Sequence, residues 1–407
     1  MKRVKIPFVV LLVLSRLLFF PADGRLVFEA AAAQAEGQPV TDREPTQDTV
    51  FPTDNFPESV ENELNEIDRF LQEEFSLTQM EVSFSDLVRE LMSGNSREAG
   101  HLLARLASSA LFDEIGQGAR MARTLLVLGM LGAVFTAFSD VFSANSVSGS
   151  GERMVYLLSF ALLASAFFES MDIADSVLRR QTEFMRALVP AWFLTVAWSG
   201  AGAAAAGWLE LLFFLIAAVE WMYLNLLMPL IRLYVLVVLV GNMARENLLS
   251  HFAELMYTVI AWGGRSLFGV VLGFQMIQGM VLPYADAVRT AGVRKLLGAI
   301  PGIGAGAEAV TKLMLGSGVL IKNMVGAAAV VVLLVLSVVP LLKLSLLWLF
   351  YRIVAALLQP VADRRLVACI VGAAAGQKLL LMLAAAGLLL FLLTIALICA
   401  GTNVVYL

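Results

Sequence analysis

The segment RKLLGAIPGIGAGAEAVTKL, residues 294–313, carries glycines at three alternate positions, Gly302, Gly304 and Gly306. Glycine-rich loops bind phosphates when they connect a strand to a helix at a defined spacing. Here the preceding residues predict an amphipathic helix, the third glycine comes one position too early for a dinucleotide site, and no lysine directly follows as in a P-loop. Pro301 ends the helix, and the glycines let the chain turn. The pattern therefore predicts a hinge between two helices.

Residues that could carry out catalysis are sparse. The only histidines are His101 and His251, and neither has a cysteine or carboxylate at the spacing of metal ligands. The sequence has no G-x-S-x-G, H-E-x-x-H or P-loop motif. Cys369 and Cys399 lie in or near apolar segments, where cysteine is a small buried hydrophobe. We expect no enzymatic activity and no cofactor; an intramembrane enzyme would need ionisable groups converging on one cavity.

Charged residues inside apolar runs form the other candidate site. A charge within a bilayer is costly, so such residues by default mark a bundle interior or an aqueous cavity. Glu220 and Arg232 are twelve residues apart, which on a straight helix turns them about 120° from each other, so we expect no ion pair between them. Packing of helices, or anchoring at the membrane surface, is the alternative role. The candidates are Glu210, Glu220, Arg232, Arg265 and Lys343.

The composition places these residues in a membrane protein. Of 407 residues, 59% are hydrophobic and 15% are charged, and the mean hydropathy is +0.81. These values exclude an ordinary soluble globular protein and predict an all-α polytopic membrane protein. We expect contact with the lipid bilayer and no binding of nucleic acid.

Residues 1–35 predict a signal peptide. A basic start precedes an apolar run at 6–20, and AAAQA at 31–35 offers a cleavage site with small residues. Arg16 interrupts the apolar run, so retention as a membrane anchor stays open. The mature chain then begins outside the cytoplasm with an acidic linker at 36–57, whose composition does not favour folding.

The rest of the chain divides into two parts. Residues 58–123 show helical periodicity, and SFSDLVRELM at 83–92 begins with a serine positioned to cap a helix. This part is predicted as a small extracytoplasmic helical region with little core of its own. Residues 124–407 are predicted as a multipass transmembrane domain.

The apolar runs predict seven or eight transmembrane helices. A bilayer core of about 30 Å needs about 20 helical residues. The run 208–240 is too long for one untilted span and contains Pro229, so it forms either one long kinked helix or two short ones. The predicted spans are 124–144, 154–168, 187–207, 208–240, 252–280, 319–350 and 379–400.

Basic residues between two spans predict the orientation. The segment 281–322 has an excess of arginine and lysine, including Arg294 and Lys295, so the positive-inside rule places this Gly/Pro hinge loop in the cytoplasm. The same topology puts Arg364 and Arg365 outside, against the rule.

Two segments carry a recognisable pattern: VRTAGVRKLLGAIPGIGAGAEAVTKLMLGSGVLIKNMVGAAAVVVLL, from residue 288, and PLLKLSLLWLFYRIVAALLQPVADRRLVACI, from residue 340. They resemble the stage III sporulation protein AE family of endospore-forming bacteria, in detail over 288–369 and in general character elsewhere. Matching positions, proposed as the functional core, are Pro301, Gly302, Leu320, Lys322, Asn323, Pro340, Lys343, Gln359 and Pro360.

The resemblance implies a membrane protein of the mother cell, located in the outer membrane around the engulfed forespore. It implies a subunit of the channel, or feeding-tube, complex that links the two cells and resembles secretion systems, in the role of permease or export gate. Partners would be other proteins of the same operon, including a cytoplasmic ATPase and ring-forming membrane proteins, and a forespore membrane protein. The basic hinge loop would dock the ATPase.

The alternative function is a free-standing secondary transporter. Such a protein is expected to contain internal repeats with broken helices at matching positions. Pro229 and Pro340 are such breaks, yet no repeat surrounds them.

Overall fold

The protein is almost entirely helical in the part of the chain that its computed structural model describes. The described residues are 58–75, 83–92, 115–116, 118–134, 147–198, 202–243, 249–297 and 304–401. No strand occurs among them. Five stretches of helix are long and apolar enough to cross a membrane: Met154–Ala197, Leu209–Asn242, Ser250–Ile277, Gly318–Leu358 and Arg364–Ala400. The prediction of an all-α polytopic membrane protein is therefore confirmed. The signal peptide and the linker at 36–57 lie outside the described residues.

Helix α6 (Val147–Trp198) contains two spans that the sequence predicted separately, 154–168 and most of 187–207. Its 52 residues extend about 78 Å at 1.5 Å per residue. The prediction of two spans is wrong here, because the charged stretch between them continues the helix. Its charges recur at helical spacing, and Arg179 pairs with Asp175 one turn away at 2.7 Å. Residues 124–134 of the first predicted span, 124–144, are helical, and residues 135–144 lie outside the described residues.

The long apolar run at 208–240 is one helix with a widened segment in its middle. α7 (Gly202–Val219) leads into a π-helix, η2 (Glu220–Leu227), and then into α8 (Met228–Met243). The Met228 N–H donates to the carbonyl of Tyr223, five residues earlier. Pro229 follows directly, and a wide turn relieves the clash that a proline ring makes with the preceding α-helical turn. Of the two predicted alternatives, the structure has the single long helix.

Helices α9 (Ser250–Leu297) and α10 (Gly304–Leu358) extend to either side of the predicted hinge. Residues 281–297 and 304–322 are helical, so most of the segment predicted as a loop at 281–322 continues the two helices. Good helix formers such as alanine and leucine on both sides explain this extension. Pro301 and Gly302 lie outside the described residues.

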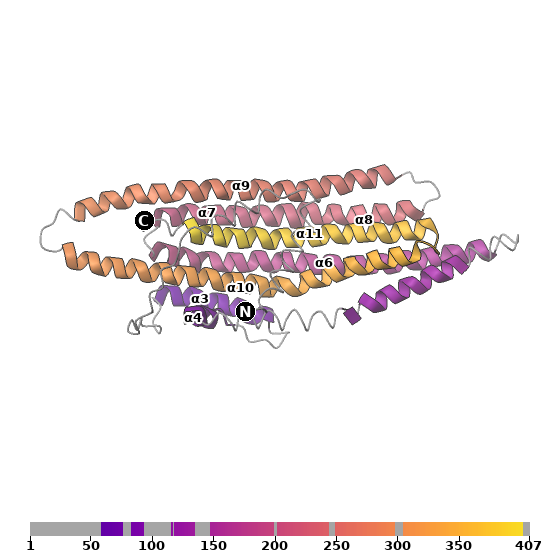
Figure 1. The fold of residues 1–407 in the computed structure, drawn as a ribbon, viewed down its shortest axis with the longest axis horizontal. Helices are drawn as coiled ribbons and strands as arrows, with labels where there is room; N and C mark the ends of the chain where they lie inside the picture. Colours follow the sequence, from indigo (N-terminus) through magenta and orange to yellow (C-terminus); the bar gives the residue numbers. More distant parts are fainter. Residues whose placement is uncertain are drawn as a thin grey trace, which may run out of the picture. The chain divides into compact units, whose positions relative to one another are not determined.

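The long helices run alternately in opposite directions, side by side (Figure 1). α11 (Arg364–Gly401) lies in the middle and contacts α6, α8, α9 and α10. Within its most apolar window 72% of the residues are buried, against 22% for α9. α11 is therefore the core of the bundle. α9 lies on one side of α11, with α6 and α10 on the other.

Two short helices, α3 (Glu58–Phe75) and α4 (Phe84–Met92), pack on the bundle near α6 and α10. The carboxylate of Asp68 accepts hydrogen bonds from the N–H of Phe84 and from the hydroxyl of Ser85, the latter at 2.6 Å. Ser83 Oγ accepts from the Asp86 N–H at 3.2 Å, which confirms the predicted serine cap. These bonds hold α3 and α4 together, and we call the pair the α3–α4 hairpin.

Candidate functional site

The interior of the bundle contains polar side chains in an otherwise apolar core. Lys322 of α10 is 0% exposed. One turn further along α10, Gly326 lies against Cys399 and Ile395 of α11 and near Trp192 of α6. The absence of a side chain at Gly326 lets the helices approach closely at this point. Lys322 therefore lies where α6, α10 and α11 meet, close enough to the Cys399 thiol for an electrostatic interaction.

A second polar contact joins α6 to α10 in the middle of the bundle. Gln181 Nε2 donates to Ser337 Oγ at 2.9 Å, and both residues are fully buried. Gly387 of α11 faces them, and a Cβ there would lie 2.8 Å from Gln181 Oε1. Gly387 thus gives the glutamine its space, and three helices enclose this polar pair.

Two further glutamines tie α11 to its neighbours. Gln275 of α9 donates to Thr394 Oγ1 at 2.7 Å, and this hydroxyl donates in turn to the carbonyl of Leu390. Gln377 Nε2 donates to the carbonyl of Leu344 in α10 at 3.2 Å.

Gln181, Gln275 and Gln377 are each almost wholly buried, and among the contacts of the described residues no hydrogen bond reaches their Oε1 atoms. A buried acceptor without a donor costs about 1–3 kcal/mol. The interior thus keeps unused hydrogen-bonding capacity that a purely structural core would avoid.

The residues proposed from the sequence as a functional core are spread along α10. Lys322 is buried, whereas Leu320 is 45% exposed and Gln359 and Pro360 lie exposed in the turn after the helix. Asn323, Pro340 and Lys343 are half-buried. Lys322 and Gln359 are 37 residues apart, about 55 Å along a helix, so the structure does not bring the set to one site. Arg294 and Lys295 lie in the last turn of α9.

Two of the predicted intramembrane charges have partners on α6. Arg186 forms an ion pair with Glu220, the first residue of the π-helix. The guanidinium of Arg232 lies 5.8 Å from the centre of the Phe168 ring, a cation–π contact. As expected, Glu220 and Arg232 do not pair with each other. Sequence reasoning missed Arg186, because nothing in the sequence shows that residues 34 positions apart on two helices meet. Glu210 and Arg265 are exposed.

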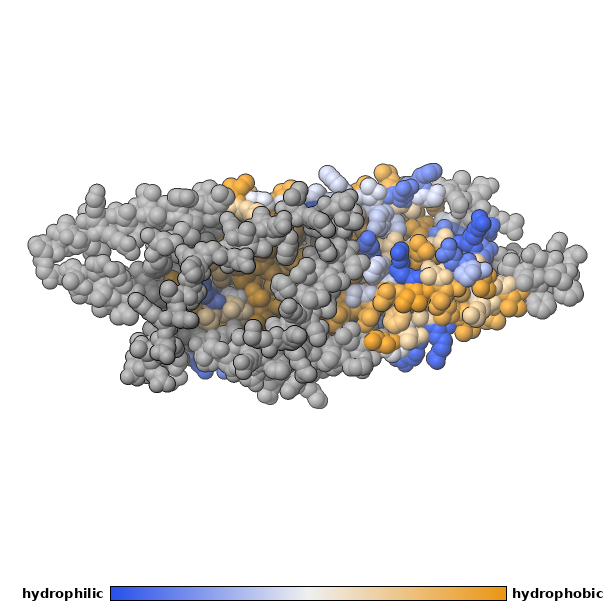
Figure 2. Space-filling model, in the orientation of Figure 1, coloured by the Kyte–Doolittle hydropathy of each residue, from blue (hydrophilic) through white to orange (hydrophobic). Residues whose placement is uncertain are grey.

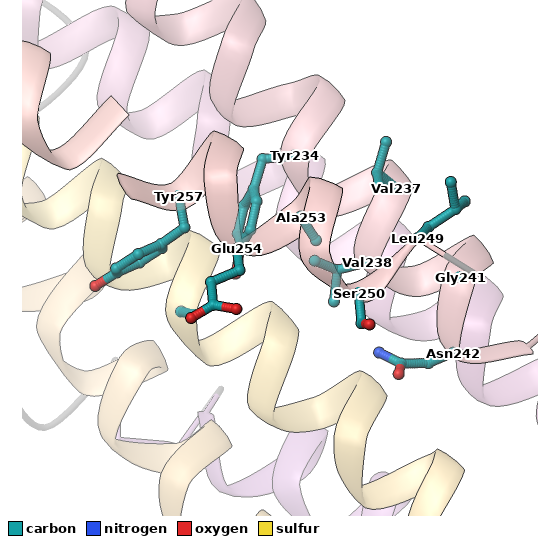
Figure 3. Close-up of a pocket in the computed structure, with 11 residues that line it drawn as sticks. Tyr234, Val237, Val238, Gly241, Asn242, Leu249, Ser250, Ala253, Glu254 and Tyr257 are labelled. Atoms are coloured by element: carbon teal, nitrogen blue, oxygen red, sulfur yellow. The ribbon is translucent and has the colours of Figure 1, made fainter. Parts of the chain in front are cut away.

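A pocket of about 350 Å³ lies between α8 and α9, beside Ala375 of α11 (Figure 3). The rings of Tyr234 and Tyr257 line it with their centres 5.8 Å apart, and the Glu254 carboxylate lies beside them. Its lining is mostly apolar, and no sequence pattern predicted this pocket. His251 Nδ1 lies 4.0 Å from Glu254, so a carboxylate does stand near this histidine, contrary to the sequence reading. Across the described residues, no group of three or more His, Cys, Asp or Glu side chains is arranged to hold a metal ion.

Fold and interior together define a class: an all-α, multi-pass membrane protein with a few polar side chains buried in an apolar core. Comparison with known proteins identifies the family within this class. The family model of stage III sporulation protein AE matches residues 82–402, so the chain belongs to this family. Stage III sporulation protein AE of Bacillus subtilis (strain 168) is 25% identical over 283 residues, which cover 69% of this chain and 71% of that protein. No solved structure matches the chain. The protein is thus a sporulation protein of the membrane, as the sequence resemblance predicted.

Proposed function

We propose that the protein is a non-enzymatic membrane subunit of the channel complex that links mother cell and forespore, in the position of its permease or export gate. The match to the stage III sporulation protein AE family over residues 82–402 carries this proposal. The protein would act in the outer membrane around the forespore. Its partners would be the other proteins of its operon, among them a cytoplasmic ATPase and ring-forming membrane proteins, and a forespore membrane protein.

The buried glutamines support a role in passage rather than in anchoring alone. A subunit that only anchors partners in lipid gains nothing from buried amides, because each buried polar group costs stability unless it is fully hydrogen-bonded. The glutamines at 181, 275 and 377 nevertheless lie in the core. A bundle that opens a polar path would use these groups when it opens.

The ends of α9 and α10 near the predicted hinge would dock the energising partner. Arg294 and Lys295 close α9, and Lys312 follows in the early part of α10. Positively charged residue types near two helix ends would suit an acidic face of a cytoplasmic ATPase.

Recovery of partners from membranes tests the proposed function. Sporulating cells carrying a tagged copy are mildly cross-linked at the end of engulfment, and the proteins that co-purify are identified by mass spectrometry. Recovery of the other stage III sporulation proteins is expected. Recovery of this chain alone, while an unrelated tagged membrane complex from the same cells stays intact, would favour the free-standing transporter.

A set of variants tests the docking surface in the same experiment. Neutralising Arg294, Lys295 and Lys312 to glutamine should remove the ATPase from the recovered complex and leave the membrane partners in it. Neutralising Arg364 and Arg365, at the opposite end of the bundle, is the matched control. Unchanged ATPase recovery with the first set would end the docking hypothesis.

A further inference from the structure

The exposed face of α6 changes character halfway along the helix. Exposed positions recur every three or four residues and so form one stripe. In its first half the stripe consists of Met154, Leu157, Leu158, Ala161, Ser165 and Phe168. In its second half it consists of the exposed residues Glu169, Asp172, Arg179, Glu183 and Arg186, with the half-buried Asp175 among them. The first half suits lipid, and the second half, which we call the charged α6 face, suits water.

The charged α6 face lies at the same depth as apolar surface on the other side of the bundle. Arg186 pairs with Glu220, and the next residue, Trp221, is 62% exposed. Two contacts give the level of Arg186 along α11. Gly387 of α11 faces Gln181 of α6, and Ile395 of α11 lies near Trp192 of α6. Arg186 lies between Gln181 and Trp192, so it lies at a level between Gly387 and Ile395 of α11.

Gln275 of α9 reaches α11 at Thr394, which also lies between those levels. Its neighbours Phe274 and Met276 are both about half exposed, at 47% and 55%. Arg186 and the apolar α9 residues Phe274 and Met276 therefore lie at similar depth, and α6 and α9 lie on opposite sides of α11 (Figure 1).

Helix α9 has the surface of a lipid-facing helix along its candidate span. From Phe252 to Ile277 its exposed large side chains are mostly apolar, with two exposed charges, Glu254 near the start and Arg265 near the middle. This length is about 38 Å at 1.5 Å per residue, more than a hydrocarbon core of about 30 Å. The large exposed residues are Phe252, Leu255, Val259, Trp262, Val270, Phe274, Met276 and Ile277.

The α3–α4 hairpin gives an independent indication that the α6 side faces water. Phe70 and Phe84 place their ring centres 6.3 Å from that of Phe184, which lies beside the charged α6 face in the sequence of α6. The outer positions of α3 are all polar: Glu61, Asn62, Asn65, Glu66, Arg69, Gln72 and Glu73. A helix pair with this surface would not be stable against lipid tails.

We propose that the charged α6 face and the α3–α4 hairpin line a water-filled space at the depth of the bilayer, while α9 faces lipid. One charge at the centre of a bilayer costs about 2.5–3.5 kcal/mol on an insertion scale, so six on one face would oppose a lipid-facing position strongly. In water they carry no such cost. Within the channel complex, on whose proposal this assignment rests, α6 is the wall of the aqueous path.

The charges on the wall indicate what it would admit. Four carboxylates, those of Glu169, Asp172, Asp175 and Glu183, lie on this face with two guanidiniums, those of Arg179 and Arg186, which form the Asp175–Arg179 and Glu220–Arg186 pairs. The face therefore has an acidic excess, and acidic groups along a path favour cations. The path would favour neutral and cationic polar solutes over anions.

Cysteine accessibility tests the assignment in the full-length protein. In a background with Cys369 and Cys399 replaced by alanine, single cysteines replace Asp172, Arg179 or Glu183. Membranes from sporulating cells are broken so that both surfaces are open, and the rate of modification by a small, charged thiosulfonate reagent is measured. Because only the thiolate reacts, a thiol in water should react on the order of a hundredfold faster than one in lipid.

Cysteines at Val270 and Phe274 on α9, whose depth is close to that of Glu183, are the controls and should react slowly. Slow reaction at all three α6 positions would overturn the proposal, since lipid or a tightly packed partner would then cover the face. Fast reaction on both α6 and α9 would overturn it as well, because this half of the bundle would then lie outside the bilayer. Variants that form heat-resistant spores establish that the protein has folded.

The same membranes separate this assignment from the proposed function. If the α6 cysteines are modified slowly and the other stage III proteins are recovered, the aqueous-wall assignment is wrong while the proposed channel subunit is supported. Fast α6 cysteines in a chain that purifies alone would keep the aqueous wall and assign it to a free-standing transporter.

Discussion

Helices α6 and α9 have similar lengths, 52 and 48 residues, and lie on different sides of α11, yet their exposed surfaces differ. The surface of α9 stays largely apolar along its candidate span, whereas that of α6 becomes charged after Phe168. Figure 2 shows hydrophobic and hydrophilic residues side by side on one described part of the surface. Crossing length and apolar content therefore do not determine what a membrane helix faces. Four experiments test the difference between α6 and α9.

The largest effect is expected on the α6 side, where the hairpin is docked. Phe84→Ala removes a fully buried ring and should destabilise the docked hairpin by about 3–5 kcal/mol, because a cavity remains at Phe184. Limited proteolysis of membranes should then cleave α3 and α4 while the bundle stays intact. Arg89→Ala, at an exposed side chain of α4, is the control and should resist cleavage like the unmodified protein.

The next largest effect is expected for a charge placed on α9. Phe274→Asp should cost about 2.5–3.5 kcal/mol if this side chain faces lipid, and should lower the amount of protein in the membrane. The matched change on α6, Glu183→Leu, should shift stability by less than about 0.5 kcal/mol if its face is in water. Quantitative immunoblots of membrane fractions measure both. Equal losses from the two variants would contradict the difference between the helices.

An intermediate effect is expected in the core, where α11 packs against α6 at Gly387. Gly387→Val places a side chain against Gln181 and Leu178, and should cost about 1–3 kcal/mol because the core has no room. Thermal unfolding in detergent measures the loss. Gly273→Val, at a position with open space around a Cβ, is the control for the lower flexibility of valine. A midpoint for Gly387→Val equal to that of the control would show that the helices separate easily here.

The smallest effect is expected for the ion pair at the edge of the charged α6 face. Arg186 and Glu220 are partly exposed, and such pairs in water contribute about 0–1 kcal/mol. A double-mutant cycle with Arg186→Met and Glu220→Gln should therefore give a coupling energy in this range. A pair held in lipid would behave as a buried pair, and loss of one member would then cost about 3–5 kcal/mol. That larger value would place the pair away from water.

Sequence patterns predicted the local features well. Helical periodicity and apolar content predicted long membrane helices, and the serine before α4 caps it as expected. The family resemblance followed from quoted segments that the family model also covers. These features depend on neighbours within a few turns of the chain.

The sequence predictions were wrong where hydropathy, averaged over a short stretch, did not show that a helix continues. The charged stretch of α6 lowers hydropathy between residues 168 and 187, so the helix was divided into two spans. Glycine and proline near residue 301 suggested a long loop, although the helices extend to 297 and resume at 304. Hydropathy reports the environment of side chains, whereas a helix ends only where its backbone hydrogen bonds end.

The sequence by itself determined that this protein is helical, that it belongs in a membrane, and which family it resembles, because these properties follow from composition, periodicity and short motifs. Only the tertiary structure decided that Lys322 and Gln181 face the core, that Arg186 meets Glu220, and that the charges of α6 share one outer face. The contact between Gln181 and Ser337 joins residues 156 positions apart. Such contacts depend on how whole helices pack, and helix packing is set by surfaces that lie far apart in the chain.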